Sequence, residues 1–220
     1  MIEYYFCHGF GFSPIYWKNF VHLLTEGKAN FINLGYFKVG NAIHQADSLT
    51  ANNQNKTFKI AIGHSLGFMK LISSSINFDL LIGINAFNDF LGDGELYKQR
   101  QIEHTQLVNN FNLNPVRTLT KFYRRCGLKE PMDDLTNINI VNLLGDLKSF
   151  LNKVTLPQNT PILIINTTDD IIVPHALNLI NFLNHNNLTL KLLTNGAHGI
   201  VLNNAEETAK LINDFTKNYV

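Results

Sequence analysis

The stretch IAIGHSLGFMK, residues 60–70, decides the fold of this sequence. An apolar run typical of a buried strand ends at Gly63, and a run typical of a helix begins at Leu66. Between them stands Ser65, flanked by glycines at a point where side chains would collide with nearby backbone in a sharp turn. Ser65 is either the cap of an ordinary helix or a nucleophile at the tip of a strand-to-helix turn. The second interpretation requires a base and an acid elsewhere in the chain.

The sequence around this turn alternates short apolar runs with longer amphipathic runs. Short runs rich in Ile, Leu, Phe or Val are typical of strands buried on both faces, and the longer runs are typical of the helices that cover them. The pattern predicts an α/β fold with a mostly parallel central sheet flanked by helices. The expected strands are Ile2–Cys7, Asn30–Leu34, Phe58–Ile62, Leu80–Asn85, Ile162–Asn166 and Leu188–Leu193. The expected helices are Ile15–Leu24, Ala42–Ala51, Leu66–Ile76, His175–Asn184 and Ala205–Lys217.

One region interrupts this alternation. Between Asn88 and Pro157 no run resembles a strand, and helix-like segments follow one another. A long strandless segment in a β/α chain indicates a helical insertion packed over the sheet. We therefore predict a core of residues 1–87 and 158–220 and a helical cap of residues 88–157. The cap should cover the carboxyl ends of the strands, where open α/β sheets bind ligands.

The composition argues against several classes of protein. The 220 residues are 45% hydrophobic, enough to bury a full core, and the formal net charge of +1 gives no global field of the kind that marks a nucleic-acid-binding protein. The two cysteines, Cys7 and Cys126, do not make a disulfide framework. The start MIEYYFCHG lacks the basic region of a signal peptide, and no apolar run approaches the roughly 18 residues of a membrane span. We expect a cytoplasmic protein with neither nucleic-acid nor membrane partners.

A base and an acid follow Ser65 in the chain. Of the eight histidines, His198 is the best candidate base, because it lies in a glycine-flanked loop just after the last expected strand. The acid should follow the apolar strand in PILIINTTDDIIVP, where Asp169 and Asp170 are both candidates. The chain order serine, aspartate, histidine favours the interpretation of Ser65 as a nucleophile. A serine that only caps a helix would not require an acid and a base elsewhere in the chain.

Two backbone groups are candidates for an oxyanion hole. Acyl transfer needs donors aimed at the oxygen that becomes negatively charged, and no metal or organic cofactor. The first donor is the N–H of Leu66, the residue after the serine, and the second is the N–H of Phe10 in the loop FCHGFGF. Gly9 and Gly11 allow this loop to approach a substrate closely.

The motifs HGFGFSPIYW, GHSLG, DDIIVP and AHG together resemble the α/β-hydrolase superfamily. Within it they resemble most closely the pimeloyl-[acyl carrier protein] methyl ester carboxylesterases of biotin synthesis (BioH-like). The resemblance spans the chain outside the cap, from Cys7 to about Val201. It implies that the acid is Asp170, because in this family the acid stands four residues before the proline of a D-x-x-V-P stretch. The sequence departs from the family at Phe10, where tryptophan is common, and at Thr167-Thr168, which replace a glycine-containing turn.

The arginines of the chain suggest a partner. Every arginine lies in the expected cap, and a run of cations in NPVRTLTKFYRRCG recurs at the spacing of one helix face. A solvated charged face is the ordinary interpretation of such a run. The concentration of arginine in one element instead favours an acidic protein partner, such as acyl carrier protein, above the mouth of the site. The expected partner-binding residues are Arg100, Arg117, Lys121, Arg124 and Arg125. The opposite face, expected to pack on the core, is Val116, Leu119, Tyr123 and Cys126.

Together these features predict a serine carboxylesterase that acts on ester substrates without a cofactor. Ser65 is expected to attack the ester, His198 to act as base and then acid, and Asp170 to orient the imidazole. The resemblance implies that the substrate is the methyl ester of pimeloyl-[acyl carrier protein]. Two alternatives stay open: another enzyme on the same scaffold, such as a thioesterase or a carbon–carbon lyase of menaquinone synthesis, and a ligand receptor that keeps the triad.

Overall fold

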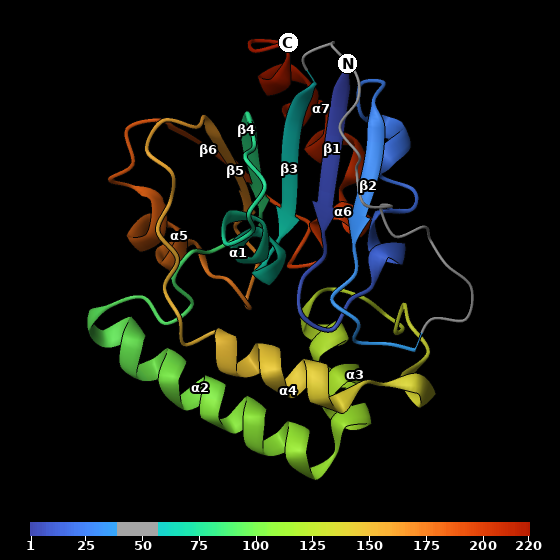
Figure 1. The fold of residues 1–220 in the computed structure, drawn as a ribbon. Helices are drawn as coiled ribbons and strands as arrows, with labels where there is room; N and C mark the ends of the chain where they lie inside the picture. The colour runs from blue at the N-terminus through green and yellow to red at the C-terminus, as the bar shows by residue number, and fades with distance from the viewer. Residues whose placement is uncertain (39–56) are drawn as a thin grey trace.

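The centre of the fold is a six-stranded sheet in which all neighbouring strands are parallel (Figure 1). The computed structural model describes residues 1–38 and 57–220, so the expected helix Ala42–Ala51 lies outside the described residues. The strand order is β2-β1-β3-β4-β5-β6, and the predicted α/β fold with a central sheet is confirmed. The strands are β1 (Ile2–Cys7), β2 (Lys28–Ile32), β3 (Phe58–His64), β4 (Leu80–Ile84), β5 (Ile162–Thr167) and β6 (Leu188–Leu193).

The strand order places the end of β3 at the middle of one edge of the sheet. The chain builds outward from β1 to β2, then returns to the other side of β1 and continues through β3, β4, β5 and β6. The connections therefore leave in opposite directions on the two sides of the β1–β3 pair. Ligands of open α/β sheets bind at the carboxyl ends of the strands at such a reversal, and Ser65 follows β3 there.

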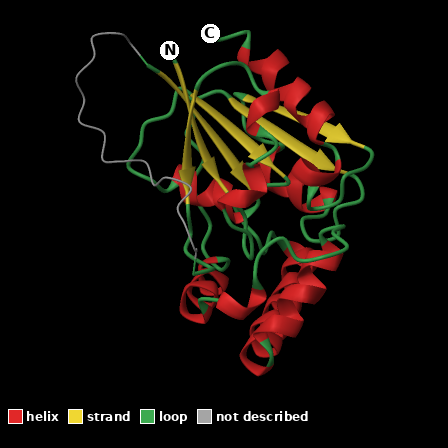
Figure 2. Ribbon diagram, turned by 90° about the vertical axis from the view of Figure 1, so that its right-hand side faces the viewer, coloured by secondary structure: helices red, strands yellow, loops and turns green. Residues whose placement is uncertain are grey.

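Helices cover both faces of this sheet (Figures 1 and 2). Every residue of β1 is buried, because its side chains alternate between two cores. Tyr4 and Phe6 pack in the core that contains residues of α7, whereas Tyr5 and Cys7 pack in the core that contains Phe68 of α1. The helices of these layers are α1 (Leu66–Ile72), α5 (His175–Phe182), α6 (Ile200–Asn203) and α7 (Ala205–Thr216).

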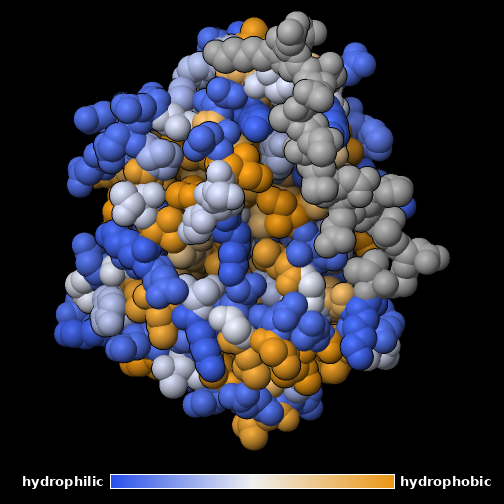
Figure 3. Space-filling view, in the orientation of Figure 1, coloured by the Kyte–Doolittle hydropathy of each residue, from blue (hydrophilic) through white to orange (hydrophobic). Residues whose placement is uncertain are grey.

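A group of helices lies across the carboxyl edge of the sheet, below the strand tips in Figure 1. An ion pair between Lys70 of α1 and Asp146 of α4 joins this group to α1, the helix that follows Ser65, and the hydroxyl of Tyr36 donates to the same carboxylate. Figure 3 shows apolar side chains gathered on its surface over α4, which exposes Val141. The group is α2 (Gly94–Leu113), α3 (Pro115–Arg125), η3 (Leu135–Asn137) and α4 (Ile140–Ser149). These elements fall within the predicted cap; its boundaries at 88 and 157 stay a prediction.

The prediction of a helix over Ile15–Leu24 is wrong. This segment forms two short 3-10 helices, η1 (Pro14–Trp17) and η2 (Val21–Leu23). A 3-10 helix places residues three apart on the same side, and this spacing buries both Trp17 and Phe20. Aromatic packing therefore determines the local geometry here.

Several other elements differ from expectation at their ends, β2 and α1 among them. β2 begins at Lys28 rather than Asn30 and ends at Ile32, because Ile32 pairs with Cys7, the last residue of β1. α1 ends at Ile72 rather than Ile76, because the hydroxyl of Ser74 donates to the carbonyl of Leu71 and competes with the helical pattern. In the described part of the chain, no helix combines the length and the apolar character needed to cross a membrane.

Candidate active site

Ser65 lies at the tip of a strained turn between β3 and α1. Its φ of 54° and ψ of −124° belong to a region that residues other than glycine rarely adopt, and strain of this kind concentrates at functional sites. A Cβ on Gly67 would overlap the carbonyl oxygen of Cys7, and one on Gly63 would overlap the backbone of Phe68. The N-cap residue of an ordinary helix has an extended backbone, and its side chain accepts a hydrogen bond from a backbone N–H of the first turn. The side chain of Ser65 accepts no such hydrogen bond. The turn therefore has the geometry of a nucleophile elbow.

His198 and Asp170 form a buried pair beside this turn. The Nδ1 of His198 lies 2.7 Å from the Oδ2 of Asp170. The other carboxylate oxygen accepts from the backbone N–H groups of Ile172 at 2.7 Å and Val173 at 2.9 Å. These bonds fix the carboxylate, so that Nδ1 of His198 carries the proton and Nε2 presents a lone pair. The side chains of both residues are at most 1% exposed, which strengthens the interaction between them.

The Nε2 atom of His198 is free to act on a neighbouring group. Among the described residues it has no hydrogen-bond partner although it is buried. Ser65 is also nearly buried, and it lines a cavity. No hydrogen bond joins the two side chains in the described structure, but nucleophile–base bonds are often long before a substrate binds. The predicted roles of Ser65, His198 and Asp170 stay predictions, and the geometry is compatible with all three.

Asp169, the other candidate acid, forms hydrogen bonds with the backbone of the loop before His198. Its carboxylate accepts from the N–H of Gly196 at 3.3 Å and from the N–H of Ala197 at 2.9 Å. Ala197 has a positive φ of 48°, so these bonds hold a strained loop just before His198. Asp169 thus orients the loop that carries the histidine and does not contact the imidazole by a hydrogen bond.

Asn85 is a positioning residue that the sequence interpretation missed. It follows β4 with a φ of 44° and is completely buried. Its amide nitrogen donates to the carbonyls of Ala197 at 2.7 Å and His198 at 3.2 Å. Its side-chain oxygen accepts from the N–H of Thr167 at 3.0 Å. The only sequence signal is an asparagine directly after an apolar strand, a residue type that tolerates positive φ.

Two further histidines pack around the site in the neutral form. His8 donates from Nδ1 to the carbonyl of Gly9 and accepts at Nε2 from the N–H of Leu34, which fixes the loop after β1. His64 donates from Nε2 to the carbonyl of His198 at 2.9 Å, and the two rings lie 4.7 Å apart. Burial lowers the pKa of His8 to about 4. Burial, reinforced by the neighbouring His198, lowers the pKa of His64 well below its usual range.

These buried histidines predict a pH-dependent stability. Below about pH 6.5 the unfolded chain takes up protons that the folded protein excludes, so the free energy of unfolding should decrease as the pH falls. The slope should reach about 1.4 kcal/mol per pH unit for each histidine, and for His8 it should end near pH 4, where the folded state also binds the proton. Urea unfolding at pH 7, 6 and 5 measures the free energy of unfolding and therefore this slope. A stability that is constant over this range contradicts the prediction, and replacement of the exposed His22 by glutamine should leave the slope unchanged.

The two predicted oxyanion donors come from different segments of the chain. Leu66 is the first residue of α1, and Phe10 follows the close approach of Gly9 to Ser65, where an added Cβ would lie 3.0 Å from the Cβ of the serine. Among the described residues neither N–H donates to a protein acceptor. Two unpaired N–H groups next to a nucleophile are what an oxyanion hole requires, and the assignment stays a prediction.

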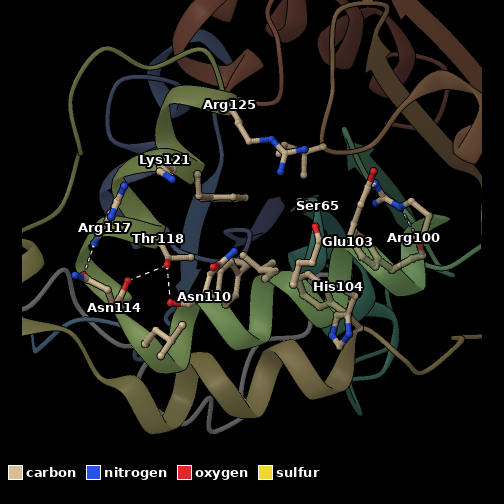
Figure 4. A pocket seen from close by; sticks show the side chains of 18 residues that line it. Ser65, Arg100, Glu103, His104, Asn110, Asn114, Arg117, Thr118, Lys121 and Arg125 are labelled. Carbon is tan, nitrogen blue, oxygen red and sulfur yellow. Dashed lines mark hydrogen bonds and ion pairs between the residues drawn. The ribbon is translucent and has the colours of Figure 1, made fainter. Parts of the chain in front are cut away.

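A cavity of about 480 Å³ connects Ser65 with the helices across the sheet edge (Figure 4). Aromatic rings form its apolar walls, and α2 and α3 contribute cations. Its volume suits a small molecule or one acyl chain. The apolar walls are Phe10, Phe90, Phe122, Phe150, Leu107, Leu113 and Ile172. The charged residues of its lining are Arg100, Glu103, Arg117, Lys121 and Arg125.

The predicted basic face is partly wrong. Arg100 is not exposed, because its guanidinium packs 4.0 Å over the ring of Phe90. Val116 does not pack on the core: it is 46% exposed, whereas Thr118 and Phe122 are buried instead. The other three residues of the expected inner face, Leu119, Tyr123 and Cys126, are buried, and the hydroxyl of Tyr123 donates to the carbonyl of Gly11. The exposed cations of α3 are Arg117, Lys121, Arg124 and Arg125, and all but Arg124 also line the cavity.

Comparisons with known proteins address the fold. No protein-family model matches the chain, and no curated protein matches it either. Solved structures match over nearly its whole length. The esterase EaEST from Exiguobacterium antarcticum matches with a TM-score of 0.74 and 14% identity, over 99% of this chain and 92% of that one. A bromoperoxidase from Bacillus anthracis matches with a TM-score of 0.73 and 16% identity, over 98% and 91%.

A third structure matches with a lower TM-score. MenH from S. aureus matches with a TM-score of 0.59 and 15% identity, over 98% of this chain and 93% of that one. The identities are low, so the similarity concerns the arrangement of the backbone. With its parallel six-stranded sheet, its strained turn after β3 and this similarity, the chain has the α/β-hydrolase fold.

Proposed function

We propose that this protein is a serine esterase that hydrolyses carboxylic esters through an acyl-enzyme. The observation that carries the proposal is the buried Asp170–His198 pair, whose Nε2 makes no hydrogen bond to a described residue and whose imidazole lies 4.7 Å from the ring of His64, the residue before the strained Ser65. This combination supplies a nucleophile, a base and an orienting acid. The esterase among the structures of the same fold supports the proposal by analogy.

The proposed reaction has two steps, and water is the only reactant that it needs besides the ester. The Oγ of Ser65 attacks the ester carbonyl while Nε2 of His198 takes the serine proton. The N–H groups of Phe10 and Leu66 stabilise the negative oxygen of the tetrahedral intermediate. The imidazolium then protonates the departing alcohol, which leaves an acyl-serine. Water, activated by the neutral His198, cleaves this ester, so that the products are an acid and an alcohol.

We further propose the methyl ester of pimeloyl-[acyl carrier protein] as the substrate. The support is the resemblance of the GHSLG and DDIIVP motifs to the carboxylesterases of biotin synthesis. The exposed cations of α3 also lie where an acidic carrier would meet the mouth of the cavity. Arg124 is the residue of this group that faces outward without lining the cavity.

The esterase proposal is tested by incubating the protein with a short aryl ester and with a fluorophosphonate. We expect multiple turnovers of the ester and covalent labelling of Ser65, identified by peptide mass. The variant Ser65→Ala should show neither. Binding of the ester without turnover or labelling would instead indicate a ligand receptor, and labelling without ester turnover would indicate another acyl or carbon–carbon bond reaction.

The carrier proposal predicts an effect of Arg124→Glu that depends on the substrate. The value of kcat/KM for a carrier-linked methyl ester should fall about 10-fold at low salt, since charges at a rim act on encounter. The loss should shrink as salt rises, because the Debye length shortens to about 8 Å at physiological ionic strength. Turnover of a short aryl ester should stay constant in the same variant. As the matched control, Lys217→Glu changes an exposed cation of the C-terminal segment; an equal loss in both variants would contradict docking on α3.

A further inference from the structure

Arg100 is a buried cation in the wall of the cavity, and three contacts fix its orientation. It belongs to α2 and is only 3% exposed. Its Nε donates to the carbonyl of Phe90 at 3.3 Å, and its guanidinium carbon lies 4.0 Å from the centroid of the same ring. Its Nη1 forms an ion pair with Glu103 at 3.2 Å. Arginine presents a planar fork, so these contacts also fix the direction of the remaining nitrogen.

That remaining nitrogen, Nη2, has no partner. It is buried, and among the described residues no acceptor lies within hydrogen-bond distance of it. Buried guanidinium N–H groups in proteins are normally satisfied, because water has been removed from them. Arg100 lines the cavity that also contains Ser65, so a molecule in the cavity is in a position to supply the acceptor.

The rest of the cavity favours a negative acceptor. Among the lining residues that the structure describes, the cations Arg117, Lys121 and Arg125 accompany Arg100, whereas Glu103 is the single carboxylate. Figure 4 shows the cations of α3 on one side of the cavity and the Arg100–Glu103 pair on the other. Burial lowers the pKa of Arg100, with Arg125 adding to the decrease, while Glu103 and Asp170 oppose it. Arg100 and Ser65 line the same cavity, so an anion bound at Arg100 would share that cavity with the proposed nucleophile.

The apolar and the cationic residues of the lining together indicate which class of ligand the cavity would bind. Phenylalanines line the cavity that contains Ser65, and Arg100, whose Nη2 is buried and unpartnered among the described residues, lines the same cavity. An apolar chain that ends in a carboxylate matches both features, since a carboxylate accepts two hydrogen bonds from an arginine fork. A neutral acyl chain would leave Nη2 unpaired.

We propose that Arg100 anchors a carboxylate-binding subsite, and that the preferred substrates are half-esters of dicarboxylic acids. The ester carbonyl lies at Ser65 and the free carboxylate at Nη2 of Arg100, with Arg125 contributing longer-range attraction. This proposal rests on the proposed esterase function and adds the class of acid that the cavity selects. It is an alternative to the carrier proposal, because the far end of a carrier-linked chain is a neutral thioester that cannot supply the carboxylate.

The first test compares monomethyl esters of dicarboxylic acids with methyl esters of monocarboxylic acids of equal length. The wild-type protein should prefer the half-esters in kcat/KM. In Arg100→Met the ratio between the two classes should fall about 10- to 100-fold, the range expected for losing one partner of a buried, charged hydrogen bond. Lys98→Met removes an exposed cation of the same helix and should leave the ratio unchanged. An unchanged ratio in folded Arg100→Met would overturn the subsite, and so would a loss confined to the carrier-linked ester.

A second variant keeps the proposal testable if Arg100→Met does not fold. Glu103→Gln keeps an oxygen that can accept from Nη1 but removes the negative charge beside it. The ratio should then rise about 2- to 5-fold, because the positive field of Arg100 is no longer opposed. A ratio that falls or stays constant would overturn the subsite.

Binding separates this proposal from the esterase proposal. Titration of Ser65→Ala with monomethyl glutarate and with methyl valerate, followed by calorimetry, should show binding of the half-ester at least about 10-fold tighter, one charge-assisted contact being worth roughly that factor. If monomethyl glutarate binds in this way but no ester is hydrolysed by the wild-type protein, the subsite stands and the esterase proposal fails. If esters are hydrolysed but monomethyl glutarate and methyl valerate bind equally, the subsite fails and the esterase proposal stands.

Discussion

Ester hydrolysis should fall by roughly four to six orders of magnitude in kcat when Ser65 or His198 is replaced by alanine, and the double variant should be little worse than either. Ser65 supplies the attacking oxygen and His198 removes its proton, so the loss of one leaves the other without a function. The structure is compatible with this coupling, because the Nε2 of His198 is buried and makes no hydrogen bond to any of the described residues.

The measurement is kcat for a short aryl ester in the two single variants and the double variant. Circular dichroism and thermal unfolding of each variant establish that the fold is intact. Free energies of activation that add fully in the double variant would show that the two residues act independently, and the proposed triad would then be wrong. A residual rate well above that of the buffer is expected, since the N–H groups of the oxyanion hole are untouched.

Asp170→Asn should reduce kcat by up to about 10⁴-fold, the loss measured for the equivalent change in the serine-protease triad. Asp170 Oδ2 accepts a hydrogen bond from Nδ1 of His198 at 2.7 Å. An asparagine whose amide nitrogen faces the imidazole stabilises the tautomer with the proton on Nε2, and that tautomer cannot accept the proton of Ser65. The backbone N–H groups of Ile172 and Val173 favour this orientation, because they require an oxygen at the other position of the side chain.

Asp169→Asn is the matched control, since it makes the same chemical change one residue away. Its side-chain oxygen can still accept from the N–H of Ala197, so the histidine loop should keep its position. We expect a loss of less than about 10-fold, the cost of weakening one exposed charge-assisted hydrogen bond. Steady-state kinetics of both variants on one ester decides the assignment. A larger loss in Asp169→Asn would make Asp169 the acid, against the observed hydrogen bonds.

Much of the fold was predictable because the information is local. Strands such as β1, β5 and β6 are short apolar runs, and their limits follow from the sequence to within one residue. The GHSLG turn was also readable, because its two glycines and its serine are adjacent in the chain. Asp170 and His198 could be grouped with Ser65 before any coordinates, since the carboxyl ends of parallel strands meet at one edge of the sheet.

The sequence alone determined the α/β sheet and the turn at Ser65, because each depends on residues that are neighbours in the chain. It also offered candidates for the partners of Ser65, because parallel strands end at the same edge of a sheet. Only the tertiary structure decided which way the polar side chains point. It directs Asp170 to the imidazole and Asp169 to the backbone of the loop, and it turns Arg100 inward to Phe90. The helix α2 buries only Arg100, His104 and Phe111. Because two of these three residues are polar, the sequence of α2 has no regular spacing of apolar residues from which its buried face could be predicted. That orientation is fixed by contacts between segments distant in sequence, which periodicity does not encode.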